Sequence, residues 1–163
     1  MRDTAQVVEA LLRAYRAIAV EMAELPIVNP RLSVDALGFR EWNGGHAGIV
    51  VTPWFMNVVI VLPEGSQVVE PGTRVARQFP AGQLEFVTSV IDGVGPIEGC
   101  SLISPMGQFR DMPHALEVAR DAASALFTAP VTKEPTPVVE SAPAKPEPAP
   151  SRRDLFRRAF SLG

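Results

Sequence analysis

The chain has few of the residues that usually carry chemistry or covalent links. Its 163 residues include one cysteine and two histidines, and aromatic side chains make up 7% of the total. A single cysteine excludes an intrachain disulfide and any zinc site built from cysteine pairs, which suits a reducing compartment. Charged residues reach only 20%, whereas hydrophobic residues reach 47%. This composition is typical of a globular protein with a core of ordinary size.

Hydrophobic runs long enough to span a bilayer are also absent. The longest, GIVVTPWFMNVVIVL at 48–62, is shorter than the ~18 apolar residues required, and Pro53 interrupts it. The first twenty residues carry Asp3, Glu9 and several arginines within a helical pattern, which is not the pattern of a secretory signal. We therefore expect a soluble, cytoplasmic protein in which 48–62 forms two buried strands around a turn.

Signatures of catalysis are missing as well. Nothing around Cys100 in EGCSLISP resembles the setting of a nucleophile, and His46 and His114 have no local partner of a known motif. The glycines of DGVGPIEG (92–99) lie between strands and do not open a helix, so they do not form a dinucleotide-binding turn. We predict a protein that is not an enzyme and has no cofactor or metal site. Cys100 is expected in a buried strand, and a cysteine-dependent enzyme is the alternative.

Two helices are predicted, one at each end of a single domain. Residues 4–24 carry apolar side chains at steps of three and four, and Asp3 followed by Gln6 forms a plausible capping box. LPIVNP (25–30) ends this helix because its two prolines cannot continue it. The second helix covers about 113–127, with Asp111 or the loop before Pro113 as its cap.

Short β-like runs separated by turn residues lie between the helices. The Asn43-Gly44 pair favours a hairpin, because both residues tolerate the positive φ of a primed turn. Close spacing favours antiparallel pairing over crossover connections. The predicted fold is α+β, an antiparallel sheet flanked by an N-terminal and a C-terminal helix, and the domain covers 1–129. The expected strands are 33–42, 46–52, 56–62, 73–79, 83–91 and 97–103.

The composition changes after the predicted domain. Residues 130–150 hold seven prolines and no aromatic residue, and we expect an extended, disordered linker because such a segment buries too little apolar surface. Residues 151–163 hold four arginines against Asp154, a balance of +3, which leaves −6 for the remainder. An acidic body disfavours nucleic acid as a partner. The basic, amphipathic tail could contact an anionic membrane or a protein groove.

Three strings resemble, in order and spacing, the HybE/HupJ family of [NiFe]-hydrogenase assembly chaperones. They are VTPWFMN (51–57), FPAGQLEF (79–86) and CSLISPM (100–106), and NPRLSVDALGFREW (29–42) is similar to the start of the family's sheet. The resemblance covers about 4–127. It implies a non-catalytic protein that binds the hydrogenase small-subunit precursor through its twin-arginine signal. Some members also associate with the large subunit, and the immature enzyme is held until its cofactors are inserted.

The cluster at Trp54, Phe55 and Met56 raises the question of where a peptide would bind. Neighbours in a strand point to opposite faces, so one core cannot easily bury all three. Aromatic and methionine side chains are typical of peptide-binding surfaces, although the same residues could instead cap the core. We expect the cluster to anchor the sheet while one or two side chains contact the signal. The candidate peptide-binding residues are Trp54, Phe55, Met56, Asn57, Phe79, Met106 and Phe109.

The tail carries a second resemblance. SRRDLFR (151–157) is similar to the twin-arginine consensus Ser-Arg-Arg-x-Phe-Leu-Lys, with two positions exchanged and Arg157 for Lys. Only RAFSLG follows, so we expect no role in export, which needs an apolar segment and a cleavage site. Arg152, Arg153 and Phe156 are candidates for a mimic of the ligand, and a solvated basic tip is the alternative. A peptide-binding or membrane-surface adaptor without a hydrogenase link is the alternative function for the whole protein.

Overall fold

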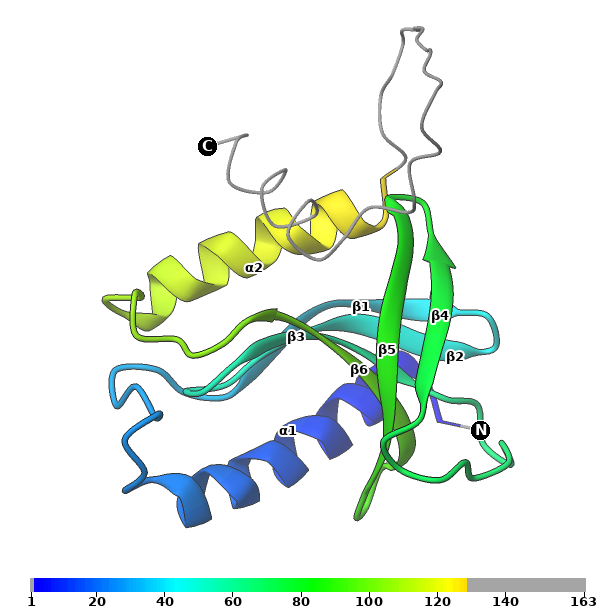
Figure 1. Ribbon diagram of the computed structural model, residues 1–163, viewed down its shortest axis with the longest axis horizontal. Coiled ribbons are helices and arrows are strands. Elements are labelled where there is room, and N and C mark those ends of the chain that lie inside the picture. The colour runs from blue at the N-terminus through cyan, green and yellow to red at the C-terminus, as the bar shows by residue number, and fades with distance from the viewer. Residues whose placement is uncertain (1, 129–163) are drawn as a thin grey trace, which may run out of the picture.

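The computed structural model describes residues 2–128, in which a six-stranded antiparallel sheet lies between two helices (Figure 1). Helix α1 (Thr4–Met22) covers one face of the sheet and helix α2 (Met112–Leu126) covers the other. The predicted α+β fold is confirmed, and each predicted helix and strand matches an observed one to within two residues at either end. The strands are β1 (Asp35–Trp42), β2 (Gly45–Val51), β3 (Met56–Val61), β4 (Arg74–Phe79), β5 (Gly82–Ile91) and β6 (Gly95–Ile103).

Both helices begin with the side-chain caps that the sequence predicts. The Asp3 carboxylate accepts the backbone N–H of Gln6 at 2.8 Å, and the Gln6 side chain accepts the N–H of Asp3 at 2.9 Å. In α2 the Asp111 carboxylate accepts the N–H of His114 at 3.0 Å, and Pro113 stands in the first turn. These bonds satisfy donors that the first turn of a helix leaves without an intrahelical partner.

The strand order is β1-β2-β3-β6-β5-β4, so β1 and β4 are the two edges. The β1–β2 hairpin turns at Asn43 and Gly44, whose φ values are 49° and 83°, as the predicted primed turn requires. Strong twist turns β4 and β5 across the direction of β1–β3 (Figure 1). As a result the ring of Trp42, on one edge strand, stacks on that of Phe79, on the other, with centroids 4.6 Å apart.

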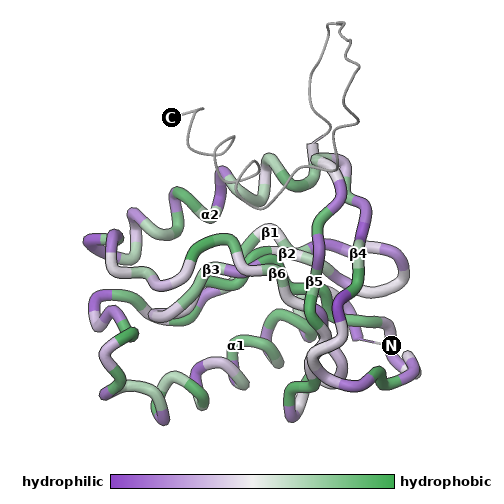
Figure 2. The backbone as a smooth tube through the Cα atoms, viewed as in Figure 1, coloured by the Kyte–Doolittle hydropathy of each residue, from purple (hydrophilic) through white to green (hydrophobic). Residues whose placement is uncertain are grey.

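The sheet has a hydrophobic core on each face. The core on the α1 side contains Val7, Leu11 and Tyr15 of the helix, and the larger core on the α2 side contains Phe86 and Leu126. Strands β2 and β3 are covered on both faces and are therefore apolar almost throughout (Figure 2). The prediction of two buried strands within 48–62 is confirmed.

None of the helices within residues 2–128 is both long enough and apolar enough to cross a membrane.

Candidate functional site

Most of the candidate peptide-binding residues lie inside the domain. Phe55 and Asn57 are partly exposed, whereas the other five side chains are buried. A peptide therefore cannot contact those five without displacing the core. The five buried candidates are Trp54, Met56, Phe79, Met106 and Phe109.

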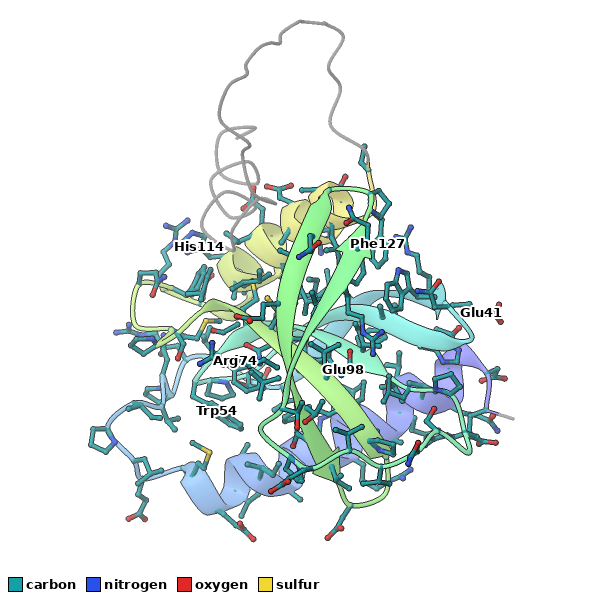
Figure 3. All side chains as sticks on the ribbon, turned by 45° about the vertical axis from the view of Figure 1, so that its right-hand side comes forward. Glu41, Trp54, Arg74, Glu98, His114 and Phe127 are labelled. Carbon is teal, nitrogen blue, oxygen red and sulfur yellow. The ribbon has the colours of Figure 1, made fainter. Side chains whose placement is uncertain are left out.

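Two cores, one on each face of the sheet, together accommodate the cluster of Trp54, Phe55 and Met56, which a single core could not easily bury. Trp54 and Phe55 pack on the α1 side and Met56 packs on the α2 side, so neighbours of opposite direction both find a hydrophobic environment. Trp54 lies between the sheet and α1 (Figure 3). A turn makes this possible, because the Thr52 hydroxyl accepts the backbone N–H groups of Trp54 at 3.2 Å and Phe55 at 2.9 Å.

Asn29 joins the loops that carry these candidates. Its side-chain amide donates to the carbonyl of Met106 at 3.0 Å and to that of Phe109 at 2.9 Å. Its backbone N–H donates to the carbonyl of Pro53 at 2.9 Å. The loops around residues 25–34, 52–55 and 104–111 therefore meet at one end of the molecule, at the left of Figure 1. The candidates from separate loops do come together, but mainly as buried support.

An exposed surface lies where α1 ends, in the segment that leads to Asn29. Within residues 2–128, Val20 (77% exposed), Leu25 (48%) and Ile27 (50%) belong to a small set of large apolar side chains that face solvent. Glu21 and Glu24 lie between them and are also exposed. Figure 2 shows hydrophobic and hydrophilic segments following one another at this end of α1. We call Val20, Glu21, Glu24, Leu25 and Ile27 the helix-end surface.

The charges of the helix-end surface are unfavourable for the helix itself. Backbone carbonyls make the C-terminal end of a helix negative, and a cation there is typically stabilising by about 0.3–1 kcal/mol. The last turn of α1 has no basic residue, Glu21 lies in it, and Glu24 follows the Ala23 cap. Neither side-chain carboxylate forms an ion pair or hydrogen bond with any other residue of the described 2–128. The arrangement favours a cationic, partly apolar partner.

Asn57 lies beside the same loops but offers a different chemistry. Asn57 in β3 is the register partner of Ser101 in β6, and its side-chain amide lies over Gly99. The Oδ1 atom is buried and accepts no hydrogen bond from the described part of the chain. Because this oxygen is covered, a ligand donor could reach it only if neighbouring side chains moved.

A pocket of about 300 Å³ lies elsewhere, between the edge strands, and was not expected from the sequence. On its floor the Glu98 carboxylate is only 2% exposed and receives two hydrogen bonds from Arg77, at 2.8 and 2.6 Å. This bidentate pairing raises the pKa of Arg77 above its usual value. Trp54, Phe55 and Met56 are not among the residues that line this pocket. Since Glu98 is already neutralised, this pocket suits an arginine-rich ligand less well than the helix-end surface does.

The basic tail and the proline-rich segment lie outside the described residues. What the sequence predicts for Arg152, Arg153 and Phe156 in the tail and for segment 130–150 therefore remains a prediction. The helix-end surface itself was missed. A sequence pattern could have indicated this surface, because Glu21 and Glu24 lie at the end of a helix that has no basic residue in its last turn. The role of Asn29 had no comparable signal, since its partners are about eighty residues away in the chain.

Comparison with known proteins identifies the family. Residues 6–158 match the family model described as [NiFe]-hydrogenase assembly, chaperone, HybE. The chain belongs to this family. The chaperone thus fits the predicted absence of catalysis, because the family is one of assembly factors. The match also runs past the resemblance over 4–127, through the proline-rich segment and into the basic tail.

Several curated proteins are similar to the chaperone over most of its length. It is 45% identical over 120 residues to the hydrogenase expression/formation protein HupJ of Bradyrhizobium diazoefficiens, covering 73% of this chain and 70% of that protein. It is 35% identical over 153 residues to HupT of Azotobacter chroococcum, covering 93% and 95%. The solution structure of HybE from Escherichia coli has the same fold, with a TM-score of 0.61 at 24% identity over 86% of this chain and 90% of that one.

Proposed function

We propose that this [NiFe]-hydrogenase assembly chaperone binds the twin-arginine signal of a small-subunit precursor in the cytoplasm, and that it does so at the helix-end surface. One observation carries the proposal. Val20, Leu25 and Ile27 are exposed beside two glutamates that have no cationic partner within residues 2–128. A signal with two arginines followed by an apolar segment is complementary to this surface in both charge and hydrophobicity.

The two parts of the signal would contact different parts of the surface. The guanidinium groups would donate charge-assisted hydrogen bonds to Glu21 and Glu24 and would also compensate the negative end of α1. The apolar segment would cover Leu25 and Ile27 and could reach the partly exposed ring of Phe55, which packs edge-on against Tyr15 at 5.8 Å. Because the acidic side chains are exposed, we expect the affinity to fall as salt concentration rises.

The buried candidates would contribute by holding the surface in shape. A binding surface is most effective when a second layer of contacts fixes its position. Asn29 follows Ile27 in the chain by two residues, and its hydrogen bonds fix this segment to Pro53 and to the 106–109 loop. The position of the helix-end surface is thereby linked to loops that contribute residues to both cores. We expect Met56→Ala to act through stability, because this side chain is fully buried. Phe55→Ala should act through affinity.

Calorimetric titration of the full chain with a synthetic twin-arginine signal peptide tests the proposal. The double variant Glu21→Gln/Glu24→Gln should bind at least about tenfold more weakly, because two charged partners are lost at some 1 kcal/mol each. Glu9→Gln/Glu117→Gln removes the same charge from exposed positions away from the surface and serves as the matched control. Equal affinity in both double variants would reject this site.

A peptide with Lys-Lys in place of Arg-Arg and a pull-down with the same variants extend the test. Lysine cannot form the bidentate contacts of arginine, so the altered peptide should bind more weakly to the wild type and show little difference between the variants. If the large subunit is also a partner, the pull-down should still recover it from Glu21→Gln/Glu24→Gln. Loss of both subunits would place both contacts at the helix-end surface.

A further inference from the structure

The chain itself contains a segment that has the chemistry the helix-end surface favours. Residues 2–128 hold fourteen carboxylates and nine arginines, whereas residues 151–163 hold four arginines and one aspartate. In that segment Arg152 and Arg153 precede Leu155 and Phe156, so paired guanidinium groups stand next to apolar side chains. We propose that residues 151–163 bind the helix-end surface of their own molecule. The segment then competes there with the signal peptide, and this second step rests on the proposed function.

The length of chain between the two sites permits this contact. The described structure ends at Thr128, and residues 129–150 precede the segment. Helix α2 has 15 residues, or about 22 Å, and ends at the opposite end of the molecule from the helix-end surface (Figure 1). The layers between the helices add about 20 Å at right angles to this length, so the straight-line separation is roughly 30 Å.

Twenty-two residues are enough for that separation without being fully stretched. A fully extended polyproline chain of this length spans about 68 Å. The root-mean-square span of a flexible chain of this length is about 26 Å, and prolines increase it. Because the typical span is close to the distance required, the effective concentration of the segment at the surface is of the order of millimolar.

Such tethering makes a weak contact effective. If the isolated segment binds the surface with a dissociation constant of about 100 μM, a millimolar effective concentration occupies the surface about nine-tenths of the time. The apparent affinity of a signal peptide is then reduced about tenfold, because only the unoccupied fraction can bind it. After its motif the segment has Ala159, Phe160 and Leu162 as apolar side chains, with Arg158 and Ser161 among them, so it offers Leu25 and Ile27 less apolar surface than a continuous apolar segment would. A signal with a longer apolar segment would therefore displace it, and the contact would select for good signals.

A paramagnetic label on the full chain tests the contact directly. We would attach a nitroxide at Ser161→Cys in a Cys100→Ser background and record amide spectra of the isotope-labelled protein. Broadening of amides at 20–27 is the expected result, and it should be lost in Arg152→Ala/Arg153→Ala. The matched control, Arg157→Ala/Arg158→Ala, removes equal charge but keeps the Arg152-Arg153 pair, and it should retain most of the broadening. A second control mixes nitroxide-labelled protein at natural isotope abundance with isotope-labelled protein that carries no nitroxide. This mixture should show no broadening, because the contact is within one chain.

Titration of the same variants with the signal peptide tests the competition. Arg152→Ala/Arg153→Ala should bind the peptide about tenfold more tightly than the wild type at low salt. Unchanged or weaker binding would overturn competition, as would broadening confined to other residues. Binding of the segment to phosphatidylglycerol vesicles without broadening at 20–27 would instead identify a membrane surface as its partner and overturn the proposal.

The failure of the two proposals can be distinguished. If the peptide binds no variant while the broadening at 20–27 persists, the proposed function is wrong, and competition falls with it. If the peptide binds at Glu21 and Glu24 but the label broadens nothing there, the proposed function stands and the contact with residues 151–163 is rejected.

Discussion

The two helices have similar amphipathic patterns but are used differently. Helix α2 buries seven of its 15 residues, up to Leu126 in its last turn. Helix α1 buries three of its 19 residues, Val7, Leu11 and Tyr15, and none after Tyr15. Helix α2 thus buries side chains along its whole length, whereas beyond Tyr15 helix α1 contributes only partly buried side chains to its core, among them Ile18 and Met22. Val20 and Glu21 are exposed in the last turns of α1, and Glu24, Leu25 and Ile27 are exposed in the segment that follows it.

The ends of the helices show the same difference. At the end of α2, the N–H of Phe127 donates to Ala123 and the N–H of Ala81 donates to the carbonyl of Leu126. Small residues let this helix approach β1 closely, since a Cβ added at Gly38 would lie 2.8 Å from that of Ala123. At the end of α1, two glutamates stand at the negative end of the helix. The end of α2 is thus packed into the fold, whereas the end of α1 is free to form the proposed helix-end surface.

The largest expected effect separates the two helix ends by their contribution to stability. Leu126→Ala should lower the free energy of unfolding by about 2–5 kcal/mol, because the side chain is fully buried and leaves a cavity. Val20→Ala, in the exposed part of α1, should change it by less than about 0.5 kcal/mol. Urea denaturation measures both. Similar losses in the two variants would refute the distinction between the helices.

Tyr15 is the last buried residue of α1, and its titration should make the stability of the fold depend on pH. Burial raises its pKa from 10.0 to about 12, so the folded protein holds this proton more tightly than the unfolded chain. The stabilisation is complete below pH 10 and is lost as pH rises toward 12, with a total loss of about 2–3 kcal/mol. Tyr15→Phe should show a flatter stability profile in this range. Tyrosinate absorbance, from the only tyrosine of the chain, would report the titration independently.

Cys100 tests whether the α2-side core has any chemical role. It is buried in that core, as predicted for a strand residue without catalytic function. Cys100→Ala should cost about 1 kcal/mol of stability and leave hydrogenase maturation largely intact. Hydrogenase activity in cells that carry this variant is the measurement. Loss of maturation in a protein that still folds normally would assign a function to the thiol.

The smallest expected effect concerns the helix-end surface, and it is a gain in stability rather than a loss. Glu21→Gln/Glu24→Gln should raise the free energy of unfolding by about 0.5 kcal/mol, because it removes negative charge from the negative end of the helix. The same variant should lose affinity for the signal peptide, which is the usual exchange between stability and function at a binding site. Thermal unfolding at low salt would detect the change. A destabilised variant would show that the glutamates have structural partners.

Local patterns were sufficient to predict most of the fold. The capping box at Asp3, the hairpin at Asn43-Gly44 and all six strands follow from interactions between residues close in sequence. The candidate site was predicted less well, because burial depends on what the rest of the chain places against a residue. The string at Trp54, Phe55 and Met56 is unusual in sequence, yet its members divide between two cores that no local pattern reveals.

The sequence by itself determined the family, the two helices, the six strands and the acidic character of the domain, because local propensity, turn chemistry and composition do not depend on distant contacts. Only the tertiary structure decided which side chains remain on the surface. The twist of the sheet brings Trp42 of one edge strand onto Phe79 of the other. Asn29 joins three loops at the end of the molecule where α1 ends, and no part of residues 2–128 covers Val20, Leu25 and Ile27, which remain exposed.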